Sequence, residues 1–387
     1  MSIVWDNDAS GYDRDHTTEI NAETLRQYID TGFTVTANSS FGPRSLWSAA
    51  EYNRLPDMSY DEYMQSDSAL YRMLMQLHTH GLAFLTEVPG SEKSVSAIAE
   101  RIGPVKNTFY GYTWDVRSVP ESKNVAYTSQ DLGFHMDLLY MEQPPHLQFL
   151  HCIRSSAAGG ASLFTDSLRS ASDLLDADTG AFNSLANNTV NFHYNHPSSA
   201  LYHQSRRVLE VDGVSYRGGV QNMLAAYSLN KHRAAFPEKN QIEEVDDIQP
   251  MEHVLAVSWS PPFQAPFGRR IAQNEPMQPL DLTSERLHAW HSAAQKFNQL
   301  IHRPEMIYER MMKPGECVLF DNRRVLHARK AFEVGDVGKE RWLRGAYLDK
   351  DPYMSKLRVL QHQLGKNAGE NAGEEATQGY FEAAAGA

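Results

Sequence analysis

The sequence predicts a mainly β protein with flanking helices, built as a β-barrel or jelly roll. Many short strand-like runs follow Gly103-Pro104, and large insertions separate several of them. A dinucleotide-binding α/β fold is disfavoured, because no Gly-x-Gly-x-x-Gly follows a strand and strands do not alternate regularly with helices.

The part of the chain before Gly103 is expected to be mainly helical. Leu70, Met73, Leu74 and Leu77 form an apolar stripe at helical spacing, and Gly81 can end that helix. The expected elements are a strand and turn over 1–20, helices over 22–29, 60–80 and 94–102, an irregular connector over 36–56, and a strand over 82–88.

The remainder alternates short strands with a few helices. Thr283 can cap one helix, and Asp351-Pro352 provides the cap and first position of the last one. Strands are expected over 133–140, 147–153, 162–165, 189–194, 207–211, 254–259, 306–311, 317–320, 325–331 and 341–349, and helices over 168–175, 285–301 and 351–364. The Gly-, Ala- and Glu-rich tail over 365–387 is predicted to be disordered.

Composition excludes several functional classes. The 387 residues carry a formal net charge of -12, which argues against nucleic acid or an anionic membrane surface as a partner. No apolar run is long enough for a transmembrane helix, and the acidic N-terminus resembles neither a secretory signal nor a transit peptide. With only Cys152 and Cys317, we expect a reduced cytoplasmic protein that acts on a small molecule.

The strand expected over 133–140 contains His135-x-Asp137. Residues two apart on a strand point to the same face, so this imidazole and carboxylate would converge on one point. A second histidine from a distant strand would complete a set of two His and one carboxylate, which suits non-haem Fe(II). Such a pair also occurs by chance, so the rest of the chain decides between a metal site and ordinary side chains.

His327 is the candidate for the second histidine among the 16 in the chain. It follows the turn signal Asp321-Asn322 and begins a strand, and a further strand places Arg341, Leu343, Gly345 and Tyr347 on one face. Arginine binds a planar carboxylate through two parallel hydrogen bonds, which lysine cannot do. Arg341 could therefore anchor a cosubstrate with a distal carboxylate.

The order His135-x-Asp137, His327, Arg341 resembles the Fe(II)/2-oxoglutarate-dependent dioxygenases, and more closely the γ-butyrobetaine and trimethyllysine dioxygenases of carnitine synthesis. Similar stretches run from about Leu46 to Leu364. They include Thr108–Trp114, Asn124–Thr128, Pro144-Pro145, Leu150–Cys152, Gly159-Gly160 and Gly345–Tyr347. The corresponding division of the chain is a reduced N-terminal segment over 1–45, a dioxygenase domain over 46–364, and the tail over 365–387.

The resemblance implies a double-stranded β-helix (jelly-roll, cupin-like) core with Fe(II) bound by His135, Asp137 and His327. It implies that 2-oxoglutarate chelates the ion and that Arg341 and Ser162 hold its far carboxylate. O2 is the other cosubstrate, and ascorbate is expected to stimulate turnover. The oxidative chemistry belongs to these cofactors, and the protein supplies binding and orientation.

The resemblance also implies a substrate site. Tyr110, Trp114, Tyr127 and Tyr347 match an aromatic cage, whose ring faces attract a quaternary ammonium. The alternative is that these aromatic residues belong to the core. Asn124 matches an asparagine that contacts the substrate carboxylate, although it could instead cap its own turn.

Two departures from the family pattern affect this reading. The animal enzymes carry an N-terminal zinc module with three cysteines and a histidine. Here His16 could match that histidine, but no cysteine precedes Cys152, so structural zinc is not expected. In Val257–Pro262, Ser260 stands nearest to a second substrate-binding asparagine, and the two prolines after it would reshape that wall.

The leading interpretation is a dioxygenase that hydroxylates γ-butyrobetaine to carnitine. The alternatives are trimethyllysine, or another amine or amino acid processed by hydroxylation, desaturation or ring closure. A binding protein that has lost catalysis would be expected to have lost one of the metal or anchor residues, and all are present.

Two further expectations concern assembly and motion. The resemblance implies a homodimer, and Tyr353, Leu357 and Leu360 of the last helix could pack on a neighbouring subunit or on the barrel. Residues 116–131, between two cage segments, are interpreted as a lid over the site.

Overall fold

The computed structural model describes residues 2–4, 17–19, 41–117, 131–156, 159–212, 219–235, 250–267, 284–332 and 341–370. The chain divides into two compact units, Met1–Arg44 and Ser45–Ala387. In the first unit, β1 (Ser2–Val4) pairs antiparallel with β2 (Thr17–Glu19). The helix expected over 22–29 lies outside the described residues.

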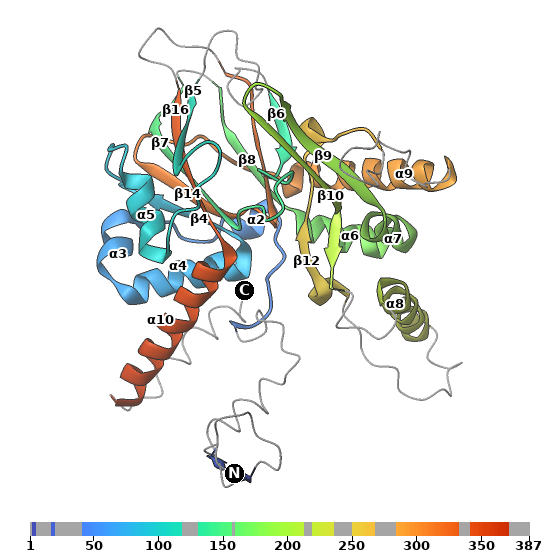
Figure 1. Cartoon of the computed structure of the whole chain (residues 1–387), viewed down its shortest axis with the longest axis horizontal. Helices are drawn as coiled ribbons and strands as arrows, with labels where there is room; N and C mark the ends of the chain where they lie inside the picture. The colour runs from blue at the N-terminus through green and yellow to red at the C-terminus, as the bar shows by residue number, and fades with distance from the viewer. Residues whose placement is uncertain are drawn as a thin grey trace. The chain divides into compact units, whose positions relative to one another are not determined.

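Two sheets form the core of the second unit (Figure 1). The six-stranded sheet has the order β3 (Met58–Ser59), β4 (Leu82–Thr86), β14 (Glu316–Asp321), β7 (Leu147–Arg154), β16 (Trp342–Leu348), β5 (Thr113–Arg117). The four-stranded sheet has the order β13 (Tyr308–Arg310), β8 (Ser162–Asp166), β15 (Val325–Arg329), β6 (Leu132–His135). Neighbouring strands are antiparallel except β3 and β4, and side chains of both sheets line one cavity.

Two smaller sheets lie within the long insertion between β8 and β13. β9 (Thr189–His196) and β10 (Ala200–Arg207) form a hairpin, and β11 (Leu209–Val211) pairs with β12 (Val254–Val257). The strand expected over 207–211 is therefore the end of β10 followed by β11. The hairpin contributes side chains to the cavity described below.

The helices form two groups, one on each side of this core (Figure 1). The first group packs on the six-stranded sheet and contains α3 (Tyr60–Gln65), α4 (Asp67–His80), α5 (Ser94–Ile102) and α10 (Lys350–Glu370). The second contains α6 (Ser167–Ala177), α7 (Thr179–Asn187), α8 (Gly219–Ala235) and α9 (Ser284–Ile301). Shorter helices are α2 (Ala49–Tyr52), η4 (Pro250–His253), η5 (Pro261–Phe263) and η6 (Pro304–Met306). None of the helices in the described residues is long and apolar enough to span a lipid bilayer.

Several boundaries differ from the sequence-based expectations. The helix expected over 60–80 is two helices, because Ser66 has an extended backbone and its hydroxyl accepts a hydrogen bond from the Ala69 amide as the N-cap of α4. The connector over 36–56 contains α2, which a Ser48–Glu51 capping box starts. The last helix continues to Glu370, six residues into the segment predicted to be disordered.

The apolar face of α10 packs within its own chain. Tyr353, Leu357 and Leu360 have exposed fractions of 2%, 0% and 3%, and the Tyr353 hydroxyl donates to the Leu74 carbonyl oxygen at 3.0 Å. These side chains pack on the α4 and α5 side of the protein and give no support to a dimer contact there. The homodimer stays a prediction.

A buried ion pair joins the turn after β14 to the start of α6. Arg324 donates from Nε to Asp166 Oδ1 at 3.1 Å and from Nη2 to Oδ2 at 2.8 Å, and its Nη1 donates to the Thr79 carbonyl oxygen at 2.7 Å. Asp166 also accepts from the Leu168 amide as the N-cap of α6. Both side chains are almost fully buried, so neither charge can be solvated by water if its partner is removed.

We therefore expect Arg324→Met to lower the free energy of unfolding by about 3–5 kcal/mol, since Asp166 would stay buried without a cation. Lys330→Met is the matched control, because it removes the exposed ion pair with Glu309 and should cost less than about 1 kcal/mol. Urea denaturation measures both variants. Equal losses would contradict the assigned importance of the buried pair.

A pH dependence of stability follows from His151 on β7. This side chain is fully buried, neither ring nitrogen has a hydrogen-bond partner among the described residues, and burial lowers its pKa from 6.5 to about 4. Between these values the unfolded chain binds a proton that the folded chain does not bind, so stability falls as the pH falls through this window. One such histidine contributes up to about 1.4 kcal/mol per pH unit.

The variant His151→Leu replaces this titrating imidazole with an apolar side chain that suits the buried position. Its urea midpoint should fall less than that of the wild-type protein between about pH 7 and pH 5. The same pH slope in both proteins would show that His151 does not contribute.

Candidate metal centre and adjoining pocket

A cavity of about 320 Å³ lies between the two sheets. Its walls come from β5, β7 and β16 on one side and from β6, β8 and β15 on the other, with the β9–β10 hairpin and η5 adding further side chains. Among the residues that line it, Asp137 is the one acidic side chain. The cavity therefore offers aromatic and cationic surface far more than anionic surface.

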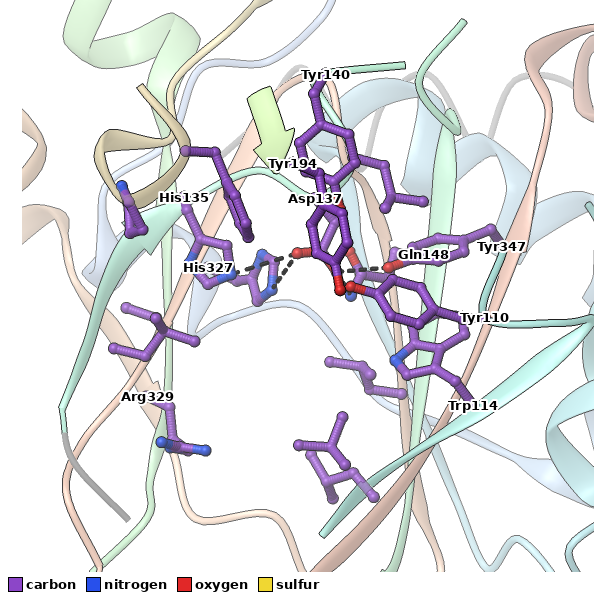
Figure 2. A pocket seen from close by; sticks show the side chains of 18 of the residues that line it. Tyr110, Trp114, His135, Asp137, Tyr140, Gln148, Tyr194, His327, Arg329 and Tyr347 are labelled. Atoms are coloured by element: carbon purple, nitrogen blue, oxygen red, sulfur yellow. Dashed lines mark hydrogen bonds and ion pairs between the residues drawn. The ribbon is translucent and has the colours of Figure 1, made fainter. Parts of the chain in front are cut away.

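Three predicted ligands converge on this cavity. His135 ends β6 and lies directly opposite His327 on β15, with ring centroids 4.2 Å apart. Oδ1 of Asp137 lies 3.4 Å from Nε2 of His135 and 4.0 Å from Nε2 of His327. One ligand atom from each residue falls within 4.8 Å of the other two. Figure 2 shows the side chains of His135 and His327 beside the Asp137 carboxylate. The structure thus brings together the three side chains that the sequence analysis selected.

The local backbone differs from the expected continuous strand. β6 ends at His135, and Asp137 lies in a bend before Leu138, whose φ is 59°. Asn322, in the turn between β14 and β15, holds this bend: its Oδ1 accepts from the Asp137 amide at 2.8 Å, and its Nδ2 donates to the Asp137 carbonyl oxygen at 3.0 Å. Convergence with His135 therefore comes from a braced bend rather than from strand alternation.

The protonation states suit a cation. Nδ1 of His135 donates to the Gly133 carbonyl oxygen at 2.8 Å, because a carbonyl oxygen can only accept, and Nε2 is the ring nitrogen that faces Asp137. Burial and the neighbouring His135 lower the pKa of His327 to about 3. Burial opposes ionisation of Asp137, but the two histidines and the Tyr347 hydroxyl hold its pKa well below its usual value. Two imidazoles and one carboxylate fit Fe(II) and leave positions open for other ligands.

Two arginines line the cavity together with Ser162. Arg341 precedes β16 and Arg329 lies on β15, and both are 6% exposed. Their guanidinium groups lie 5.6 and 4.9 Å from the ring centroid of Phe332, and burial together with Arg329 lowers the pKa of Arg341 to about 10. Ser162 on β8 is the cross-strand neighbour of Arg329. Sequence reasoning missed Arg329, although its place two residues after His327 on one strand predicts the same face.

Three of the four residues predicted to form an aromatic cage line the cavity, and the fourth, Tyr127, lies outside the described residues. Trp114 on β5 stacks on Tyr347 on β16, with ring centroids 3.9 Å apart and planes 16° from parallel, and Tyr110 lines the same cavity. The Tyr347 hydroxyl donates to Asp137 Oδ2 at 2.7 Å, so this residue also belongs to the metal centre. Asn124, Tyr127, His16 and most of the expected lid over 116–131 lie outside the described residues.

Ser260 does not line the cavity, contrary to its expected contact with substrate. Its side chain is 1% exposed, and the chain turns directly after it into η5. That turn presents Pro262 and Phe263 to the cavity in its place. The wall at this point is therefore formed by Pro262 and Phe263 and not by Ser260.

Other lining residues were not selected from the sequence. Gln148 lies on β7 inside the expected strand, and its amide contacts Asp137. The β9 strand supplies His193, Tyr194, Asn195 and His196. The ring of Tyr194 lies 5.4 Å from that of Tyr140 and 6.4 Å from that of Tyr110. No local signal could have placed this hairpin at the cavity, because its position depends on packing of the long insertion.

Comparison with known proteins agrees with this chemistry. The model of the taurine catabolism dioxygenase TauD, TfdA family matches residues 40–347. The dioxygenase str8 of Strobilurus tenacellus is 33% identical over 334 residues, which cover 82% of this chain and 66% of the relative. The human γ-butyrobetaine dioxygenase is 28% identical over 311 residues, which cover 80% of this chain and 68% of the relative. The mitochondrial trimethyllysine dioxygenase of Bos taurus is 25% identical over 320 residues, which cover 82% of this chain and 64% of the relative. The chain thus spans about two thirds of the length of these relatives.

The stack of Trp114 on Tyr347 depends on Gly345, the cross-strand partner of Trp114. A Cβ at Gly345 would lie 2.3, 2.5 and 2.7 Å from three atoms of the indole ring. We expect Gly345→Ala to displace Trp114 and to lower the free energy of unfolding by about 1–3 kcal/mol. Near-ultraviolet circular dichroism and urea denaturation measure the two effects.

Gly133→Ala on β6 is the matched control, because a Cβ there meets no atom within 4 Å. It should leave both the aromatic signal and the urea midpoint close to those of the wild-type protein. If the two variants behave alike, the close contact at Gly345 does not position Trp114.

Proposed function

This chain belongs to the TauD/TfdA family of dioxygenases, and we propose on that premise that it is an Fe(II)- and 2-oxoglutarate-dependent dioxygenase. The observation that carries this proposal is the cluster of His135, Asp137 and His327, whose ligand atoms lie within 4.8 Å of one another. His135 and His327 would each bind the ion through Nε2, and Asp137 would bind it through Oδ1. When bound, iron and 2-oxoglutarate supply the activation of O2 that no side chain can provide.

We also propose that the two facing sheets form the double-stranded β-helix of this family. The chain passes alternately between them, from β5 to β8 and again from β13 to β16. This alternation supports a jelly roll, since such a fold is built by strands that cross repeatedly between two sheets. It also accounts for a site whose ligands lie far apart in the sequence.

Arg341 is the proposed anchor for the far carboxylate of 2-oxoglutarate. A guanidinium can donate two parallel hydrogen bonds to a carboxylate, and burial strengthens that interaction. Ser162 and Arg329 line the cavity and are cross-strand neighbours, so they can add a hydroxyl and a second positive charge to the same carboxylate. The apolar side chains Leu132, Leu150 and Leu343 line the cavity and limit access of water.

The proposed substrate is γ-butyrobetaine, and the proposed reaction is its hydroxylation to carnitine. Support comes from the 28% identical γ-butyrobetaine dioxygenase and from the aromatic lining around Trp114 and Tyr110. Because Asp137 is engaged in the metal centre, aromatic ring faces are the groups that this lining offers to a quaternary ammonium. Cytoplasmic location and a role in carnitine synthesis stay predictions from the sequence.

The second candidate is the same chemistry on trimethyllysine or on another amine or amino acid. It is favoured by the displaced Ser260 and by Phe263 and the β9 residues at the cavity, which differ from the contacts expected for the carboxylate of γ-butyrobetaine. The 33% identical relative carries a name that gives no substrate.

The experiment is an assay of succinate formation from 2-oxoglutarate with Fe(II) and ascorbate. The panel contains γ-butyrobetaine, trimethyllysine, their unmethylated analogues and common amino acids, and His135→Ala is the blank. We expect γ-butyrobetaine to stimulate turnover with carnitine as the product. Stimulation by unmethylated compounds alone would support the dioxygenase activity but would contradict the proposal that the aromatic side chains bind a quaternary ammonium. Wild-type turnover no greater than that of the blank with every compound would support the silent binding protein.

A further inference from the structure

We propose that Gln148 and Tyr347 are positioning residues of the metal centre, which hold one oxygen of Asp137 so that only the other binds the ion. We call this pair of donors the Asp137 clamp. The inference rests on the iron site of the proposed function and assigns a role to two side chains that touch no proposed ligand of the ion except Asp137.

The two oxygens of Asp137 have different surroundings (Figure 2). Oδ2 accepts from Gln148 Nε2 at 2.8 Å and from the Tyr347 hydroxyl at 2.7 Å. Oδ1 faces the two histidines, at 3.4 and 4.0 Å from their Nε2 atoms. Two donors occupy the lone pairs of Oδ2, so Oδ1 is the better ligand atom.

The clamp connects the two sheets. Asp137 follows β6 of the four-stranded sheet, whereas Gln148 and Tyr347 are direct cross-strand partners on β7 and β16 of the six-stranded sheet. Their side chains are 1% and 2% exposed, and the Tyr347 ring is held by its stack on Trp114. Both donors therefore reach Oδ2 from one rigid surface, which limits rotation of the carboxylate.

This restraint matters for the number of open positions. Two imidazoles and one carboxylate oxygen leave three of the six positions around iron for other ligands, whereas a carboxylate that binds through both oxygens leaves two. Hydrogen bonds to the ligands from surrounding residues typically change metal affinity about 10–100-fold when they are removed. The clamp would thus maintain the affinity of the site for the ion. It would also keep open the three coordination positions that a chelating cosubstrate and O2 require.

The test measures Co(II) binding to the metal-free full-length protein, by calorimetry and by the visible absorption of the bound ion. Tyr347→Phe removes one donor but keeps the ring on Trp114, and Gln148→Leu removes the other at similar volume. We expect each variant to raise the dissociation constant for Co(II) about 10-fold or more. We also expect the absorption band to change in intensity, because a second carboxylate oxygen can then join the coordination.

Tyr353→Phe is the matched control, because it also removes a buried tyrosine hydroxyl, which donates to the Leu74 carbonyl oxygen on α4 rather than to a proposed ligand of the ion. Its dissociation constant and absorption band should equal those of the wild-type protein. Urea denaturation establishes that all variants are folded.

Three results would overturn the clamp. The first is a Tyr347→Phe dissociation constant within about twofold of wild type and an unchanged band. The second is equal weakening by Tyr353→Phe, which would indicate a general effect on stability. The third, a folded wild-type protein that binds no Co(II), would overturn the iron site as well, so failure of the clamp alone is distinguishable from failure of the proposed function.

Discussion

The antiparallel pairing of β6 with β15 is the constraint on which the site depends. It places His135 directly opposite His327, and residues opposite each other in such a ladder lie about 5 Å apart. Two imidazoles that are 192 positions apart in the sequence therefore meet without help from a flexible loop. A slip of one residue in this register would move one of them to the other face of the sheet and destroy the cluster.

Side chains of the turn between β14 and β15 stabilise this pairing through buried hydrogen bonds and a buried ion pair. Asn322 binds the backbone of Asp137 through both its amide and its carbonyl groups, and Arg324 binds Asp166 at the start of α6. Both are almost fully buried, so each hydrogen bond is made in a region of low dielectric constant, where an unpaired polar group is costly. One short turn thus fixes the metal-site bend and a helix of the long insertion relative to the same strand.

The cavity is lined by cationic and by aromatic side chains, which suit ligands of different chemistry. Arg341, Arg329 and Ser162 supply positive charge and a hydroxyl, whereas Trp114, Tyr110 and the hairpin residue Tyr194 supply aromatic surface. Tyr347 lies at the boundary, since its ring stacks on Trp114 and its hydroxyl binds the metal-site carboxylate. A change in the aromatic wall can therefore act on the metal centre through this one side chain.

Local patterns in the sequence were enough to indicate β-strands with flanking helices, the residue types of His135, Asp137 and His327, and the face that Arg341 shares with Tyr347 on β16. The described structure is one of mixed sheets and helices rather than mainly β, because the long insertion and both ends of the second unit add several helices. These features depend on residue type and strand alternation, which are properties of neighbouring residues. The register of β6 on β15 and the bend at Asp137 were decided by tertiary structure. So were the hairpin at the cavity and the removal of Ser260 from its wall. Each depends on contacts between segments separated by tens to hundreds of residues, and spacing along a single sequence carries no record of such contacts.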